Sequence, residues 1–170
     1  MFGTRCDTLV FMFKKLRKKI AHFIFAPKPL REIVLVLPYD TTTHKLLIIE
    51  EYIHHYDRKF WKLVTGGIDK KDIDNLQHAH EELAEEMAMR SDNLYHFHSF
   101  EKVFGMRGIH CFVAEDPIVM EHPPENPDTD VITQSKWINE QELWEVIDTK
   151  ELIWNESAMA AAQVFRRYKN

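Results

Sequence analysis

Three glutamates in one segment are spaced so that they could hold a divalent cation. Glu85 and Glu86 follow Glu82 at three and four residues. On an α-helix these steps place all three carboxylates within an arc of about 100°. Like charges this close repel one another, and Mg²⁺, which prefers oxygen ligands, would relieve that repulsion. The alternative is an ordinary solvated face of an amphipathic helix.

The residues around these glutamates favour the metal-binding interpretation. A glycine pair, Gly66-Gly67, stands shortly before them. Because glycine has unusual backbone freedom, we expect the pair to let a strand turn sharply into the loop that presents the helix. The apolar spacing predicts that helix over about residues 74–90. Its expected core face carries Leu76, Ala79, Leu83 and Met87.

The segment 66–89 resembles the signature of the Nudix hydrolases. In that signature a glycine is followed, at fixed distances, by an arginine and by glutamates that bind metal. Gly67 matches the glycine, and Glu82, Glu85 and Glu86 match glutamates without a gap. The resemblance implies that these three glutamates bind Mg²⁺ or Mn²⁺, with Glu85 and Glu86 acting in catalysis.

Three positions depart from the signature. Ile73 stands where the first glutamate is expected, Glu81 replaces the arginine, and Ala88 replaces the second glycine. In the family, the first glutamate and the arginine orient the metal-binding carboxylates, so their loss predicts slow turnover. Glu81 is expected either to be an outer metal ligand or to pair with a lysine such as Lys70 or Lys71.

A weaker likeness extends over residues 30–168. The stretch 50–69 is similar to the one that leads into the signature in the branch of ADP-ribose and nucleotide-sugar pyrophosphatases. The resemblance implies a Nudix fold, an α/β/α sandwich around a mixed β-sheet. It also implies Mg²⁺-dependent hydrolysis of the diphosphate bond in a nucleoside diphosphate-linked compound, either ADP-ribose-like or a nucleotide sugar. The alternative is a catalytically weak or inactive module that binds a nucleotide or a protein partner.

Residues on both sides of the glutamate segment are expected to contact such a substrate. Tyr56, Arg58 and Gly67 precede the glutamates, and Arg107 follows them. An aromatic ring can stack on a base, and a guanidinium can bind phosphate through two hydrogen bonds.

Loop acids and histidines add further candidates. The general base of that branch is often an acid on a late loop, and Asp128 and Asp130 lie nearest that position. The alternative is a solvated acidic loop. His78 is expected either on the helix surface or in contact with metal or phosphate. His96 and His98 should share a strand face, which makes only a weak zinc site.

Length, composition and charge limit the remaining classes. The chain has 170 residues, 45% of them hydrophobic and 29% charged, which is typical of one globular domain. Two cysteines predict a reducing, cytoplasmic location. The first 31 residues carry eight Lys or Arg and one acid, so the remainder is strongly acidic. This acidic body argues against nucleic-acid binding.

The basic segment predicts a separate leader. We expect residues 1–30 to form it and residues 31–170 to form the domain. Within the leader, residues 9–25 have an apolar and a basic helical face. That helix could pack on the domain or associate weakly with a membrane, and homodimer formation is left open.

Short strands and later helices are expected to position the site. The sequence predicts a β-hairpin from two strands, then a strand stopped by Gly66-Gly67 before the glutamate helix, then more strands and two helices. This order favours a mixed sheet covered on both faces. The expected strands are 32–37, 45–50, 60–65, 94–104, 109–114 and 135–139, the later helices 139–148 and 155–168, and the long loop 115–130.

Overall fold

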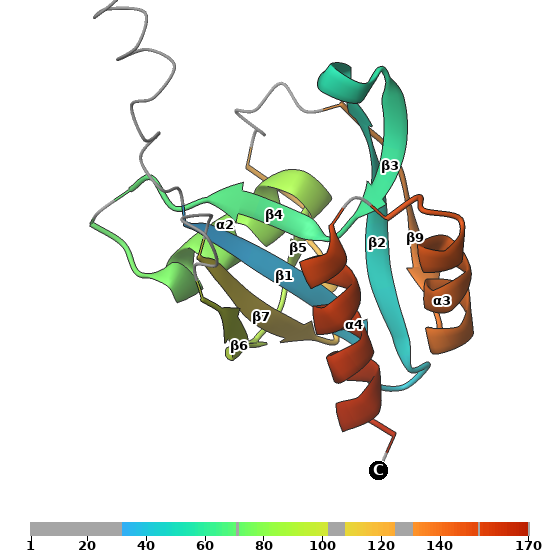
Figure 1. The fold of residues 1–170 in the computed structure, drawn as a ribbon. Coiled ribbons are helices and arrows are strands. Elements are labelled where there is room, and N and C mark those ends of the chain that lie inside the picture. The colour runs from blue at the N-terminus through green and yellow to red at the C-terminus, as the bar shows by residue number, and fades with distance from the viewer. Residues whose placement is uncertain (1–31, 71, 102–107, 125–130, 153, 170) are drawn as a thin grey trace, which may run out of the picture. The chain divides into compact units, whose positions relative to one another are not determined.

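The structure is a computed structural model that describes residues 32–70, 72–101, 108–124, 131–152 and 154–169. In these residues, seven strands form one mixed sheet (Figure 1). Two further short strands, β5 (Met89–Arg90) and β8 (Ile118–Val119), pair with each other. The main sheet has the order β3 (Arg58–Lys62), β2 (Lys45–Ile53), β1 (Ile33–Asp40), β7 (Ile109–Glu115) and β6 (Asn93–Phe100), with β4 (Val64–Gly67) on β1 and β9 (Val131–Ile138) on β2.

Strand β1 lies at the centre of the sheet. It pairs in parallel with β7 from Ile33 to Tyr39 and antiparallel with β4 at its start. It joins β2 through the expected hairpin, where the side chain of Asp40 accepts hydrogen bonds from the backbone N–H groups of Thr42 and Thr43. The run of apolar residues at its start is therefore buried on both faces, as central strands require.

Helices cover both faces of the sheet, so the expected α/β/α sandwich is confirmed. Helix α2 (Asn75–Met87) packs Ala79 and Leu83 on one face, and α3 (Glu140–Asp148) and α4 (Asn155–Arg167) pack on the other. Figure 1 shows α2 and α4 on opposite sides of the sheet. Leu83 is fully buried, and its truncation to alanine would cost about 2–5 kcal/mol.

Side-chain caps define where two of these helices begin. Asp74 accepts a hydrogen bond from the N–H of Gln77 at the start of α2. At the start of α3, Asn139 and Glu142 form a reciprocal capping box. Each cap satisfies backbone donors that the first helical turn leaves without a partner.

Several expected boundaries were wrong. The single strand expected over 60–65 is two strands that part at Leu63, because β3 pairs with β2 while β4 pairs with β1. Strand β9 begins at Val131 rather than at 135, and the expected loop 115–130 contains β8. Leu76, expected in the core, is 38% exposed in the first turn of α2.

The leader predicted over residues 1–30, including the helix 9–25, lies outside the described residues. The boundary between leader and domain therefore stays a prediction. In the part of the chain that is described, no helix is long and apolar enough to cross a membrane.

Candidate active site

Glu82 lies directly against the backbone of β4. A Cβ atom added to Gly66 would stand 1.8 Å from the carboxylate carbon of Glu82, whereas one added to Gly67 would meet no atom within 4 Å. Strand β4 runs through both glycines, and neither has a left-handed backbone dihedral. The expected sharp turn was therefore wrong. Gly66 leaves room for the Glu82 carboxylate, which approaches its backbone closely.

Glu86 occupies a buried position one turn further along α2. Its side chain is 6% exposed and accepts a hydrogen bond from the backbone N–H of Thr65 at 3.4 Å. The ammonium of Lys62 lies 3.3 Å from the Glu86 carboxylate and 2.5 Å from the carboxylate of Glu51. We call Glu51, Lys62 and Glu86 the buried triad. Its members come from β2, β3 and α2 and meet in the layer between helix and sheet.

Burial and charge pull the pKa values of Glu86 and Lys62 in opposite directions. Burial raises the pKa of Glu86 to about 7, although Lys62 and the N–H of Thr65 oppose that shift. Burial acts to lower the pKa of Lys62, but the carboxylates of Glu86 and Glu51 outweigh it and hold that pKa above its usual value. Lys62 is therefore charged at neutral pH, and Glu86 changes its protonation state close to neutral pH.

A second lysine neutralises the outer carboxylates of α2. Lys70, in the loop after β4, lies 2.6 Å from Glu81, which also accepts a hydrogen bond from Gln77. The hydrogen bond to Glu81 raises the pKa of Lys70, and the charge of Glu85 adds to that shift. Of the two roles expected for Glu81, the structure shows the lysine pair.

The three predicted metal ligands lie along one side of α2 but contact different neighbours. Glu82 packs on Gly66, and Glu86 belongs to the buried triad. Glu85 interacts with the charge of Lys70. Among the described residues, no three His, Cys, Asp or Glu side chains are grouped as they would be around a metal ion. The oxygen donors suit Mg²⁺ or Mn²⁺ chemically, so metal binding by these glutamates stays a prediction.

The predicted substrate contacts Tyr56 and Arg58 lie together at the far end of β3. The Arg58 guanidinium stands 4.4 Å from the ring centre of Phe60, and the ring of Tyr56 meets the same ring edge-on at 5.5 Å. Tyr56 is 56% exposed. Arg58, Phe60 and Lys62 lie on one face of β3, so Arg58 stands about 13 Å along the strand from Lys62 of the buried triad. This row of side chains runs from the triad to solvent.

His78 does not lie on the helix surface, which was one of the two expectations for it. It is 2% exposed, and its Nε2 atom lies 3.1 Å from the backbone carbonyl oxygen of Lys70. The imidazole therefore fixes the start of α2 to the loop after β4.

The expectation that His96 and His98 share a face was also wrong. A bulge at Phe97 places His96 opposite Phe112 and His98 opposite Cys111, which are neighbours on β7 and point to opposite faces. His96 instead bonds the hydroxyl of Ser99 at 2.8 Å.

Three predicted site residues, Arg107, Asp128 and Asp130, lie outside the described residues. Conversely, sequence reasoning missed Lys62 and Glu51. The available signal was the lysine between Trp61 and Leu63, which interrupts an apolar run with a charge. Its two acidic partners are distant in sequence, so only the fold identifies them.

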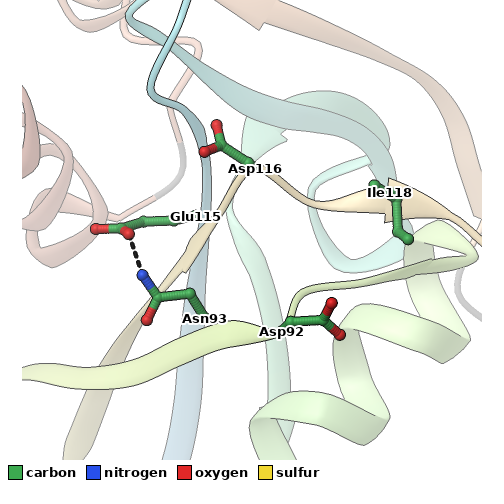
Figure 2. Close-up of a pocket in the computed structure, with 5 residues that line it drawn as sticks. All are labelled: Asp92, Asn93, Glu115, Asp116 and Ile118. Carbon is green, nitrogen blue, oxygen red and sulfur yellow. Dashed lines mark hydrogen bonds between the residues drawn. The ribbon is translucent and has the colours of Figure 1, made fainter.

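A pocket of about 230 Å³ opens elsewhere, and no predicted site residue lines it (Figure 2). Its acidic side chains already have partners. Glu115 accepts a hydrogen bond from Asn93, shown as a dashed line in Figure 2, and Asp116 accepts two from Thr41. We assign no ligand to this pocket, which is lined by Asp92, Asn93, Glu115, Asp116 and Ile118.

Similar solved structures share the architecture described above. No protein-family model matches the sequence, and no curated protein matches it. The chain is similar to the crystal structure of an ADP compounds hydrolase, with a TM-score of 0.67 and 17% identity over 84% of this chain and 75% of that one. It is also similar to MutT, in work on Aliivibrio salmonicida and Vibrio cholerae, with a TM-score of 0.60 and 14% identity over 81% of this chain and 98% of that one. The chain therefore has the Nudix fold.

Proposed function

We propose that the chain is a Mg²⁺-dependent hydrolase that cleaves the diphosphate bond of a nucleoside diphosphate-linked compound, ADP-ribose-like or a nucleotide sugar. The observation that carries the proposal is the seating of α2 on β4, with Glu82 against Gly66 and Glu86 against the N–H of Thr65. This arrangement gathers acidic oxygens beside an open strand backbone. The likeness of the fold to that of an ADP compounds hydrolase supports the choice of substrate.

The side chains have separate proposed roles. Glu82, Glu85 and Glu86 would hold Mg²⁺ or Mn²⁺, which when bound neutralises diphosphate charge and lowers the pKa of a water. Arg58 and Tyr56 would hold the part of the substrate that extends along β3. The open space above Gly67 would admit it.

The residues outside the described part have proposed roles as well. Asp128 or Asp130 would act as the general base, and Arg107 would bind phosphate.

A specific observation favours a second function, a module that binds a nucleotide or a protein partner with little catalysis. Glu86 is already paired with Lys62, and the signature departs at Ile73, Glu81 and Ala88. Where the ligand is a nucleotide, both functions use the same surface and differ only in turnover.

A release assay separates the two functions. Purified chain is incubated with a panel of nucleoside diphosphate compounds in Mg²⁺, in Mn²⁺ and in chelator, and the cleaved products are separated and measured. We expect metal-dependent cleavage that Glu85→Gln reduces at least tenfold. Glu145→Gln, an exposed glutamate on α3 away from the site, is the control and should cleave like the parent. Binding without cleavage of any compound would select the second function.

The remaining expectations about partners and location are also proposals. We propose a cytoplasmic location because the chain has two cysteines and the described one, Cys111, is a free buried thiol. Weak membrane association through residues 9–25 and homodimer formation stay predictions. Nucleic-acid binding is not proposed.

A further inference from the structure

The buried triad places a cation of the protein itself in contact with a predicted metal ligand. The side chains of Lys62 and Glu86 are each 6% exposed, and that of Glu51 is 10% exposed. An uncompensated charge at such depth would be strongly unfavourable. Lys62 is thus the counter-ion that makes two buried carboxylates tolerable in this fold.

Lys62 cannot diffuse away as a metal ion can. Its ammonium is tethered to β3, whose Trp61–Lys62 end pairs with Glu50 and Ile49 of β2. A divalent cation that binds Glu86 must therefore take this carboxylate from Lys62 or accept a strong repulsion at about 3 Å. The two cations compete for one carboxylate.

The distances also show how the competition can be resolved. Lys62 lies closer to Glu51, at 2.5 Å, than to Glu86, at 3.3 Å. When Lys62 releases Glu86 it therefore keeps a carboxylate partner without unfolding β3. Glu51, on β2, would then serve as a positioning residue that holds the ammonium against the sheet.

We infer that Lys62 is a built-in cation of the candidate site, which competes with a divalent metal ion for Glu86 and keeps metal affinity low. This inference rests on the site of the proposed function and adds its regulation. It requires that removing the charge of Lys62 creates a tighter metal site, whereas loss of an ordinary structural lysine would only destabilise the fold.

The test measures Mn²⁺ binding without substrate, by isothermal titration calorimetry and by the shift of the unfolding midpoint. We expect Lys62→Gln to bind Mn²⁺ about 10- to 100-fold more tightly than the parent, the range typical for groups that tune a metal ligand. Adding Glu86→Gln should abolish the gain. The matched control is Lys59→Gln, a lysine of the same strand that pairs with Glu50 on the other face and is half exposed. It should bind Mn²⁺ like the parent.

Equal Mn²⁺ affinity in Lys62→Gln, Lys59→Gln and the parent would overturn the inference. If Lys62→Gln folds only when Mn²⁺ is present, that metal dependence supports it. If it does not fold at all, the double variant Glu51→Gln with Lys62→Met replaces the buried pair by neutral side chains of similar size, which proteins commonly tolerate. The double variant must show the same gain, and no gain would overturn the inference.

Hydrolysis is assayed separately on the same proteins. A parent that cleaves no compound while Lys62→Gln gains metal affinity would leave the inference standing and refute the proposed hydrolase. A parent that cleaves with Mg²⁺, together with a Lys62→Gln variant that gains no metal affinity, would support the proposed hydrolase and refute the inference about Lys62.

Discussion

Replacing Gly66 by alanine should disable the candidate metal site without unfolding the protein. The new Cβ atom would stand 1.8 Å from the carboxylate carbon of Glu82 and 2.4 Å from its Cγ. Carbon atoms in contact prefer a separation of about 3.5–4.0 Å. The end of the Glu82 side chain must therefore move by roughly 2 Å, and it can do so by changing rotamer.

The expected cost in stability is small because a flexible side chain gives way. Overpacking of a well-packed site costs about 1–3 kcal/mol, whereas exchanging glycine for alanine at a compatible backbone returns about 0.4–1 kcal/mol through the unfolded state. The free energy of unfolding should therefore fall by about 0–2.6 kcal/mol. In contrast, a shift of about 1 Å in a reacting geometry can lower a rate about 100-fold, so cleavage by Gly66→Ala should fall at least that far.

The neighbouring glycine provides the control. Gly67→Ala places its Cβ in open space on an ordinary backbone, so it should unfold in urea with a stability about 0.4–1 kcal/mol above that of the parent, and its stabilisation by Mg²⁺ should match that of the parent. Gly66→Ala should lose most of the Mg²⁺ stabilisation. If the two variants respond equally to Mg²⁺, the close approach of Glu82 has no role in metal binding and the proposed site is wrong.

Three further predictions concern pH, capping and thiol reactivity. The folded chain holds more protons than the unfolded one between the ordinary glutamate pKa of 4.5 and the raised value of about 7 for Glu86. Stability should therefore fall by about 3 kcal/mol as pH rises through this window, while Lys62 stays charged, and Glu86→Gln should flatten the profile in urea unfolding. Asn139→Ala removes the capping box of α3 and should cost about 1 kcal/mol in the same assay, with unchanged Mg²⁺ response. In a Cys6→Ser background, Cys111, whose pKa burial raises to about 12, should react with a thiol reagent only after unfolding, and fast reaction of the native protein would contradict its burial.

The fold could be predicted where each segment carries its own periodic signal. The uninterrupted apolar run of β1 indicated a strand buried on both faces, and the spacing of Ala79 and Leu83 indicated the inner face of α2. Turn residues such as Asp40 marked the hairpin. These signals are local, so a single sequence contains them in full.

The errors arose where distant segments decide the local structure. The chain parts at Leu63 because different strands pair on either side of it, and no residue near Leu63 records that choice. His78 is buried because the carbonyl oxygen of Lys70 satisfies its ring nitrogen. A polar residue is usually assigned to the surface unless such a partner is known.

The positions of the lysines in the structure change how the departures from the signature are interpreted. The position that carries arginine in the family carries Glu81 here, which by itself adds negative charge to α2. The structure supplies positive charge from outside the helix, through Lys70 beside Glu81 and through Lys62 beside Glu86. These two lysines are not equivalent. Water screens the exposed pair Lys70–Glu81, which therefore contributes little to stability, whereas the buried pair Lys62–Glu86 sets the charge of the site. The absence of the helix arginine is therefore offset at the surface by Lys70, and we expect metal affinity to depend more on the buried Lys62.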